Sequence, residues 1–331
     1  MRKGSDPVRL RVAPFVQSQP GAWGQPCRPL IHGLPMKRWI LRLYAPLFLS
    51  GFVAAAIAWV GHCHGDPLWL LALLALAIAV SFMAERLWPY DPAFNHDHGD
   101  RLRDTLHAVV NEGLNLLSIA AVPLLAAIIP WQAWPQQWPF ALQVLVAIIA
   151  ADLGITLVHY ASHRIGWLWR LHAVHHSVTR MYGFNGLMKH PLHQAAEAVG
   201  GVLPLLLLGL PLPVAAVLAF AIAIQLLLQH SNVDMRPGVL GRVMAWAPLH
   251  RFHHMRYGTA GDVNFGLFLT VWDRLLGTAF DAPDYRLGTR DLGIGSQPEY
   301  PRDYAGQLLA PFRELPHGQV PEVPEGLRRR R

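Results

Sequence analysis

Residues 44–61 read YAPLFLSGFVAAAIAWVG, a run without one charged side chain. Three more uncharged apolar runs follow, at residues 68–84, 113–130 and 139–151, and the last continues past Asp152 to Val158. A helix needs roughly 17–25 apolar residues to cross a bilayer. The runs therefore predict four membrane-spanning helices in an all-α integral-membrane protein. Buried helices of a soluble protein are the alternative, and the uncharged lengths argue against it.

The composition agrees with a membrane protein. Of 331 residues, 53% are hydrophobic and only 15% are charged, and the formal net charge is +7. A basic chain can bind nucleic acid, but the apolar runs favour an anionic membrane surface, so we expect no nucleic-acid partner. The two cysteines form no CxxC pair and are too few for a disulfide framework.

The basic residues predict the orientation. The loops at residues 62–66 and 131–138 contain no Lys or Arg, whereas the other connections contain several. These basic residues are Arg86, Arg101, Arg103, Arg164, Arg170, Arg180 and Lys189. Positive residues mark the cytoplasmic side. We therefore expect a multi-pass protein, in a bacterial inner membrane, with both termini and the active site in the cytoplasm.

The apolar stretch 198–230 is interrupted by Gly209, Pro211 and Pro213. Proline ends helices, so two short half-helices that enter the membrane and return are expected here. The chain then divides into a disordered leader or alternative start (1–36), a transmembrane region (37–158), a catalytic region that includes the hairpin (159–281) and a cytoplasmic C-terminal tail (282–331). We expect the end of this tail, residues 313–331, to be a solvated basic segment.

Histidines recur at helical spacing in three motifs, and one of them is LWRLHAVHHS at residues 168–177. Residues four apart lie on one helical face about 5–6 Å apart, close enough to share a metal ion. Imidazole is a ligand for iron, copper, zinc and nickel. A single zinc ion uses three or four protein ligands, so the eight motif histidines predict two metal ions in a helical cap on the cytoplasmic side. These histidines are His159, His163, His172, His175, His176, His250, His253 and His254.

In a metal-bound histidine, the ring nitrogen that does not face the metal usually donates a hydrogen bond to a nearby polar group. Polar residues near the motifs are candidates to accept these hydrogen bonds. Asp152 lies two helical turns before His159 inside an apolar run, and an intramembrane acid is costly unless it has such a function. Asn232 is a second candidate, and Asp104, Asp262, Asn264 and Asp273 are lesser ones. For each, a helix cap or a loop hydrogen bond is the alternative.

The ordered motifs HYASH, LWRLHAVHHS, KHP, QHSN, HRFHH and NFGLFLTVWDRLLGT resemble the fatty acid hydroxylase / sterol desaturase superfamily of membrane di-iron enzymes over about residues 85–281. The resemblance implies two iron ions held by the eight motif histidines and His230. It also points to His190, which matches the histidine of the family's Arg-x-His-Pro stretch. Tyr160 stands where the family often has Arg, and His193 where it often has an acid.

The resemblance implies an oxidoreductase that hydroxylates a lipid with O₂, with sterol, fatty acyl, carotenoid and ether lipids as possible substrates. A lipid desaturase on the same site is the first alternative. A non-enzymatic metal-binding membrane protein is the second, although transporter sites lie near the membrane midplane and these histidines lie at predicted helix ends. The sequence contains no flavin or dinucleotide fingerprint. We therefore expect an external electron donor: a ferredoxin, a cytochrome or a reductase.

Overall fold

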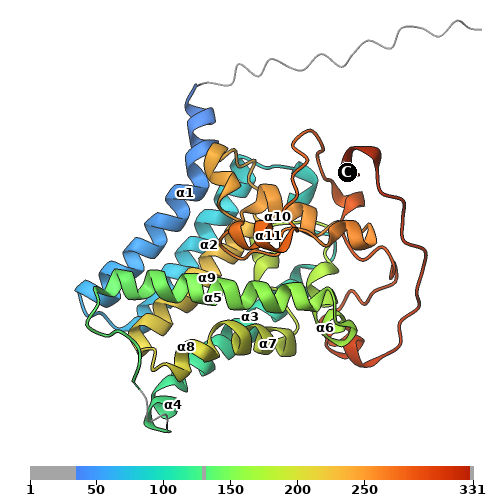
Figure 1. Ribbon diagram of the computed structural model, residues 1–331. Coiled ribbons are helices and arrows are strands. Elements are labelled where there is room, and N and C mark those ends of the chain that lie inside the picture. Colours follow the sequence, from blue (N-terminus) through green and yellow to red (C-terminus); the bar gives the residue numbers. More distant parts are fainter. Residues whose placement is uncertain (1–34, 129–131, 329–331) are drawn as a thin grey trace, which may run out of the picture.

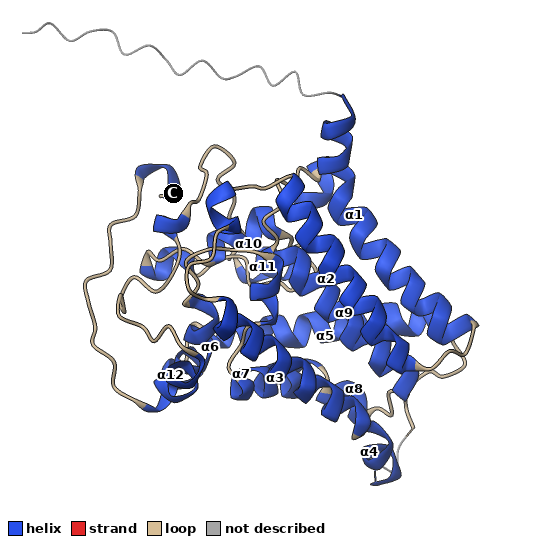
Figure 2. Cartoon of the chain, turned by 180° about the vertical axis from the view of Figure 1, so that it is seen from behind, coloured by secondary structure: helices blue, strands red, loops and turns tan. Residues whose placement is uncertain are grey.

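The computed structural model describes residues 35–128 and 132–328, so nearly all of the expected leader (1–36) lies outside the described residues. Within these ranges the chain forms helices and loops, with only isolated β-bridges (Figure 2). Among the described residues, five helices are long and apolar enough to cross a membrane. The prediction of an all-α membrane protein is thus confirmed, with five candidate spans instead of four.

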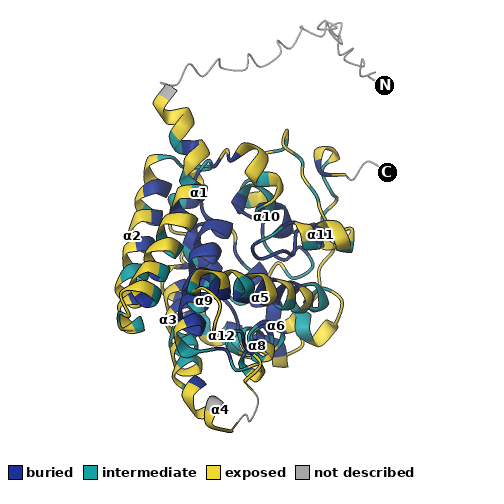
Figure 3. Ribbon diagram, turned by 60° about the vertical axis from the view of Figure 1, so that its left-hand side comes forward, coloured by how far each residue is buried: buried dark blue, intermediate teal, exposed yellow. Residues whose placement is uncertain are grey.

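The first two spans are close to the predicted runs. Helix α1 (Pro35–Ile57) continues through a π-helical turn at Ala58–His62, and α2 (Leu70–Leu87) follows a short loop. Most residues of both helices are exposed or only partly buried (Figure 3). This exposure is favourable in a lipid environment, where an apolar surface has no water to avoid.

The third span begins earlier than the apolar run predicts. Helix α3 runs over Arg101–Ala120, and the short α4 (Val122–Ile128) follows it. The first half of α3 is polar, but Asp104, His107 and Asn111 are buried against other parts of the chain. Tertiary hydrogen bonds engage all three side chains, so hydropathy alone underestimates the length of this helix. Helix α5 (Phe140–Ser162) forms the fourth span.

The interrupted stretch folds as two helical arms joined by a turn, and the second arm is longer than the predicted half-helix. Its re-entrant course through the membrane stays a prediction. Its first arm is α7 (Pro191–Gly201) with α8 (Leu203–Leu207), and its second arm is α9 (Leu212–His230), which is long enough to be a span itself. Gly209 makes the turn with φ +86°, a conformation that glycine adopts at no steric cost. The backbone N–H of Trp134 donates to the Leu208 carbonyl at 2.7 Å. The turn therefore lies beside the 132–138 loop, at the end of the bundle away from the histidines.

Helix α9 is the centre of the bundle. It packs against α1, α2, α5 and α10, and most of its residues are buried (Figures 1 and 3). Glycines allow α5 and α7 to approach closely: a Cβ atom at Gly154 would lie 2.2 Å from the Gly200 carbonyl oxygen. Small residues at such a crossing are typical of membrane helices.

Beyond the ends of α5 and α9 lies a cap of short helices: α6 (Gly166–His176), α10 (Ala247–His253), α11 (Val271–Leu276) and α12 (Tyr304–Leu309). The expected solvated end, residues 313–331, is mostly exposed over its described part, to residue 328, whereas residues 282–312 of the expected cytoplasmic tail contribute buried side chains. Leu292, Tyr300 and Ala310 join one apolar cluster of the cap, and Leu287 and Leu327 join another. The C-terminal segment therefore forms part of the cap (Figure 1).

Candidate metal centre

The predicted histidines converge where the bundle meets the cap. His159 is on the last turns of α5, and His163 directly follows that helix. Helix α6 carries His172, His175 and His176, and α9 ends at His230. Helix α10 carries His250 and His253, and His254 is its C-cap. All nine imidazoles are withdrawn from solvent, His163 being the least buried.

The nine side chains form two groups, and within each group the ligand atoms lie within 4.8 Å of one another. The first group is His159, His163, His172, His176 and His253. The second group is His175, His230, His250 and His254. The three histidines of α6 are divided between the groups, two in the first and one in the second. The three histidines of α10 and its C-cap are divided in the opposite way, one in the first group and two in the second. The chain therefore builds two potential metal sites from shared helices.

The nitrogen separations match the ligand shell of a metal ion. In the first group, Nε2 of His176 lies 3.0 Å from Nε2 of His172 and 3.0 Å from Nε2 of His253. In the second, Nε2 of His230 lies 3.1 Å from that of His175 and 3.2 Å from that of His254. With metal–nitrogen bonds of about 2.1 Å, ligands at right angles have nitrogens about 3.0 Å apart. The groups thus have the dimensions of occupied coordination shells.

The hydrogen bonds of the Nδ1 atoms show which nitrogen of each ring faces the metal site. Nδ1 of His159 lies 2.9 Å from the Phe265 carbonyl, that of His175 lies 2.9 Å from the Met188 carbonyl, and that of His253 lies 2.7 Å from the Val263 carbonyl. Carbonyls only accept, so each Nδ1 carries the proton and each Nε2 presents its lone pair inward. Several inward lone pairs at 3 Å repel one another unless a cation lies between them. The residues present therefore fit metal ions.

The electrostatics of the cap favour neutral imidazoles. Burial, with the neighbouring histidines, lowers the pKa of His172, His176 and His254 well below the ordinary value. Burial also lowers the pKa of His163, and the Asp262 carboxylate opposes this shift. A neutral imidazole has the free lone pair that metal coordination requires.

His190 lies in neither group. It is the N-cap of α7, where its Nδ1 accepts from the Leu192 N–H, and its Nε2 lies 3.2 Å from the Leu308 carbonyl. Both ring nitrogens are thus engaged, and this position fits a helix cap instead of the ligand role that the resemblance implied. His193 is fully buried beside His172, with ring centroids 4.4 Å apart. Its Nε2 contacts the Ser162 hydroxyl at 3.0 Å, and it also lies outside both groups.

Asp152 supports the site indirectly, through a loop that contacts a histidine. Its carboxylate accepts from the Phe268 and Leu269 N–H groups, from the Trp272 indole and, at 3.5 Å, from the Thr156 hydroxyl, and no histidine is among these donors. These contacts fix the segment that contains Phe265, whose carbonyl holds His159. The predicted direct bond from Asp152 to a ligand is therefore absent, although the acid does have a structural function inside the membrane region.

Asn232 also acts indirectly. Its amide donates to the Asp91 carbonyl and to Asn95, and its side-chain oxygen accepts from the Asp91 N–H. The buried Glu85 of α2, which the sequence did not single out, accepts from the backbone N–H groups of Gly183 and Asn232. Together these contacts fix the chain directly after His230 to the end of α2.

The carboxylate that touches a ligand is Asp262, which was only a lesser candidate. Its Oδ1 lies 2.9 Å from Nδ1 of His163. Asp273, another lesser candidate, accepts from the N–H groups of Phe265 and Gly266 and so holds the loop whose carbonyl orients His159. Neither contact was predictable from spacing, because each joins residues that only the fold brings together.

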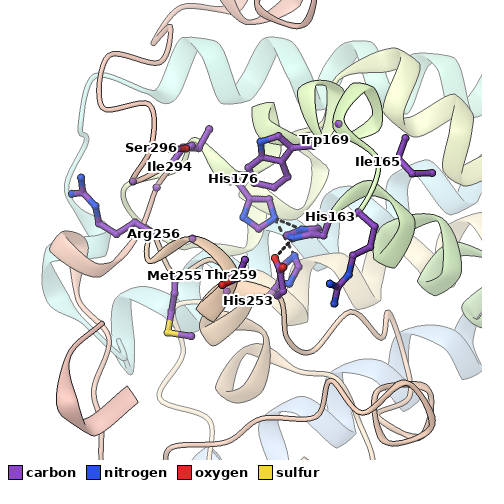
Figure 4. A pocket seen from close by; sticks show the side chains of 17 residues that line it. His163, Ile165, Trp169, His176, His253, Met255, Arg256, Thr259, Ile294 and Ser296 are labelled. Atoms are coloured by element: carbon purple, nitrogen blue, oxygen red, sulfur yellow. Dashed lines mark hydrogen bonds and ion pairs between the residues drawn. The ribbon is translucent and has the colours of Figure 1, made fainter. Parts of the chain in front are cut away.

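A cavity of about 310 Å³ reaches the first group. His163, His176 and His253 form its inner wall, and Trp169 lies beside them (Figure 4). Arg164 and Arg256 line it as well. A second cavity of about 240 Å³ between α2, α3 and α9 is mainly apolar and includes no histidine in its lining.

Comparisons with known proteins agree with this geometry. A fatty acid hydroxylase family model matches residues 144–278, a range that includes all nine histidines of the two groups. The ornithine lipid hydroxylase of Rhizobium tropici is 32% identical over 82% of this chain and 83% of its own length. No solved structure matches the chain.

Two eukaryotic relatives match over shorter ranges. An alkylglycerol monooxygenase of Danio rerio is 29% identical over 53% of this chain and 39% of its own length. A sphinganine C4-monooxygenase of Arabidopsis thaliana is 30% identical over 43% of this chain and 57% of its own. The aligned part thus spans only about two fifths to three fifths of these two proteins. The nine histidines lie inside the matched region, and the relatives are named as hydroxylases and monooxygenases of lipids. The chain is an oxidoreductase that belongs to the fatty acid hydroxylase family.

Proposed function

We propose that this protein is a membrane-bound di-iron oxygenase that hydroxylates a lipid. The observation that carries the proposal is the convergence of nine imidazoles, withdrawn from solvent, into two groups with ligand-shell dimensions. Nitrogen ligands of this kind suit iron, and two irons would supply the O₂ chemistry that hydroxylation of a C–H bond needs. His159, His163, His172, His176 and His253 would hold one ion, and His175, His230, His250 and His254 the other.

The protein's own residues would position the reaction. The carbonyls of Phe265, Met188 and Val263 keep the ligating rings in one tautomer and orientation. Asp262 strengthens the donor character of His163 by accepting its Nδ1 proton in a hydrogen bond. Deep burial of the rings excludes bulk water, which protects an oxidising site from side reactions. The overall change is R–H + O₂ + 2e⁻ + 2H⁺ → R–OH + H₂O.

We further propose that the carbon oxidised lies in or near the polar headgroup of the lipid. The cavity that reaches the ligands contains two arginines, whereas the apolar cavity lies at the other end of the bundle. Arg164 and Arg256 form no ion pair within the described residues. They are therefore available to a carboxylate or phosphate of a headgroup. A lipid with an amino-acid headgroup, such as the ornithine lipid that the Rhizobium tropici relative is named for, is the first substrate to test.

The location follows from the charge pattern. The described loops at residues 62–66 and 132–138, which lie at the end away from the histidines, contain no Lys or Arg. We propose that the protein lies in a bacterial inner membrane with the cap, the C-terminus and the di-iron site on the cytoplasmic side, and the positive-inside rule supports this orientation. We propose a catalytic region at residues 159–281 on a membrane region at residues 37–158. An external ferredoxin, cytochrome or reductase would supply the electrons.

Expression in a bacterial host that makes ornithine lipid, followed by mass spectrometry of the extracted lipids, tests this function. The expected product is the substrate lipid with one added oxygen, and fragmentation should place that oxygen in the headgroup. The His172→Ala variant is the matched inactive control. A product that has lost two hydrogens would show the alternative desaturase activity. An unchanged lipid profile in hosts that together supply ornithine, sterol, carotenoid, fatty acyl and ether lipids would contradict the proposal.

A further inference from the structure

Trp169 separates two hollows of the cap. On one side it lines the cavity that reaches His163, His176 and His253, and on the other it lines a cavity of about 340 Å³ at the protein surface. Its ring centroid lies 5.0 Å from that of His163 and 5.3 Å from that of His176. The Trp169 ring therefore lies against two side chains of the first histidine group and also borders the surface hollow.

The surface hollow is basic. Arg170 and Arg313 line it and are both exposed, and the acidic side chain in its lining is that of Glu314. Arg170 and Arg313 form no ion pair within residues 35–128 and 132–328. Gln297 and Tyr300 also line a neighbouring hollow, in which Arg103 and Asp100 are paired with each other. The exposed Arg302, which forms no ion pair within the described residues, adds a third cation there. Such a cluster of free cations attracts an acidic partner and steers its approach.

We propose that this surface, centred on Arg170 and Arg313, is the docking site of a small acidic one-electron carrier protein, and that Trp169 is the contact through which electrons enter. The inference rests on the proposed function, which consumes two electrons for each O₂. Two reduced carriers dock in turn and each is oxidised by one electron, while two protons from water complete the balance. The tryptophan keeps the carrier outside the substrate cavity, so lipid and carrier bind at the same time.

The contribution of these arginines to the affinity for the carrier can be measured directly. The probe is an acidic plant-type [2Fe–2S] ferredoxin, and the purified protein is held in nanodiscs of phosphatidylcholine, which offer no anionic lipid to compete. At an ionic strength of about 0.05 M, where surface charges are weakly screened, the Arg170→Glu/Arg313→Glu variant should bind ferredoxin about tenfold or more weakly than the wild type. The affinity of the wild type should also fall steeply as salt is added.

Two further variants test whether the effects are specific to the docking surface and to Trp169. Arg242→Glu changes an exposed arginine that lines neither hollow, and it should leave the affinity for ferredoxin unchanged. Trp169→Leu should keep the affinity but slow the reduction of the iron-loaded protein by ferredoxin, whereas reduction by dithionite, which needs no docking, should stay at the wild-type rate. An equal loss of affinity in the Arg242→Glu variant, or no loss in the Arg170→Glu/Arg313→Glu variant, would overturn the docking site.

The experiment separates this inference from the proposed function. If ferredoxin binds through Arg170 and Arg313 but no lipid is ever oxidised, the docking surface stands and the oxygenase proposal fails. If dithionite supports lipid hydroxylation while the charge reversals leave ferredoxin binding intact, the oxygenase stands and this docking surface is wrong. In that case the cations would serve another ligand, such as an anionic lipid headgroup.

Discussion

The imidazole rings of His176 and His254 stack with centroids 4.6 Å apart and planes 25° apart, yet the two side chains belong to different ligand groups. The groups are therefore in direct contact. Two metal ions held by these groups would be close neighbours, which is the arrangement that a reaction with O₂ at a di-iron centre needs. Several expected outcomes follow from this arrangement and from the contacts around it.

Loss of either group should remove metal. Iron-replete wild-type protein should contain about two irons per chain, since nine imidazoles exceed what one ion can bind. The His172→Ala and His250→Ala variants, one from each group, should each contain about one iron or less and should lose at least about 100-fold in activity, more than a supporting residue would cost. Elemental analysis and a lipid hydroxylation assay measure both effects. His62→Ala, in the loop at the far end of the bundle, should retain both irons. Full activity with a single zinc ion would contradict the di-iron centre.

Asp262 should affect metal affinity through its hydrogen bond to His163. Removal of the carboxylate in Asp262→Ala leaves the Nδ1 proton of His163 without its acceptor, and such changes cost about 10–100-fold in metal affinity or activity. Competition with a chelator measures the affinity of the loaded protein. Asp262→Glu, which keeps the charge, should recover part of the loss. Equal metal affinity in all three proteins would show that this contact does not tune the site.

Asp152 should affect stability more than metal binding. Its carboxylate accepts from two backbone N–H groups and one indole. In Asp152→Asn, one of these donors would face an amide NH₂, and an unsatisfied buried donor costs about 1–3 kcal/mol. A lower unfolding temperature in detergent with near-normal iron content is the expected result. Asp284→Asn, at an exposed loop position, is the control. Loss of iron without loss of stability would point to a direct role at the metals.

Acid should destabilise the metal-free protein. Burial lowers the pKa of His172, His175 and His254 well below the ordinary 6.5. Above about pH 6.5 these histidines are neutral in both the folded and the unfolded chain. As the pH falls below that value, the unfolded chain binds protons that the folded chain excludes, so stability is lost. Thermal unfolding of chelator-treated protein at about pH 7.5 and about pH 5.5 measures this. An equal or higher unfolding temperature at the lower pH would contradict the burial of neutral imidazoles.

The orientation can be read from cysteine labelling. Cys63 is a free, exposed cysteine in the loop after α1, so a membrane-impermeant maleimide should label it from outside intact cells. In a chain without native cysteines, single cysteines introduced by Asp284→Cys and Arg313→Cys should react only after the cells are opened, because both positions lie in the cap. Labelling of Asp284→Cys from outside would reverse the topology. Labelling of Asp284→Cys and Arg313→Cys from opposite sides would be incompatible with a single cap.

The sequence by itself determined the class of the protein and most of the histidine set. Uncharged runs of sufficient length specify membrane helices, because a helix satisfies its own backbone N–H and C=O groups in hydrocarbon and charged side chains there are costly. Helical spacing then specifies which imidazoles share a face. The spacing correctly predicts that His172 and His176 share a site. They lie on adjacent turns of one helix, so their relative position depends only on local geometry.

The tertiary structure decided how these side chains are divided and supported. His175 and His176 are neighbours in the chain but point to different groups, because successive side chains on a helix are rotated by about 100°. His190 matches a motif, yet it caps α7 away from both groups. Asp262 holds His163 across 99 positions of the chain, and Asp152 supports a loop where we expected a direct bond to a ligand. These contacts arise only when α5, α6, α9 and α10 pack together, since packing between distant segments depends on three-dimensional fit that no local pattern encodes.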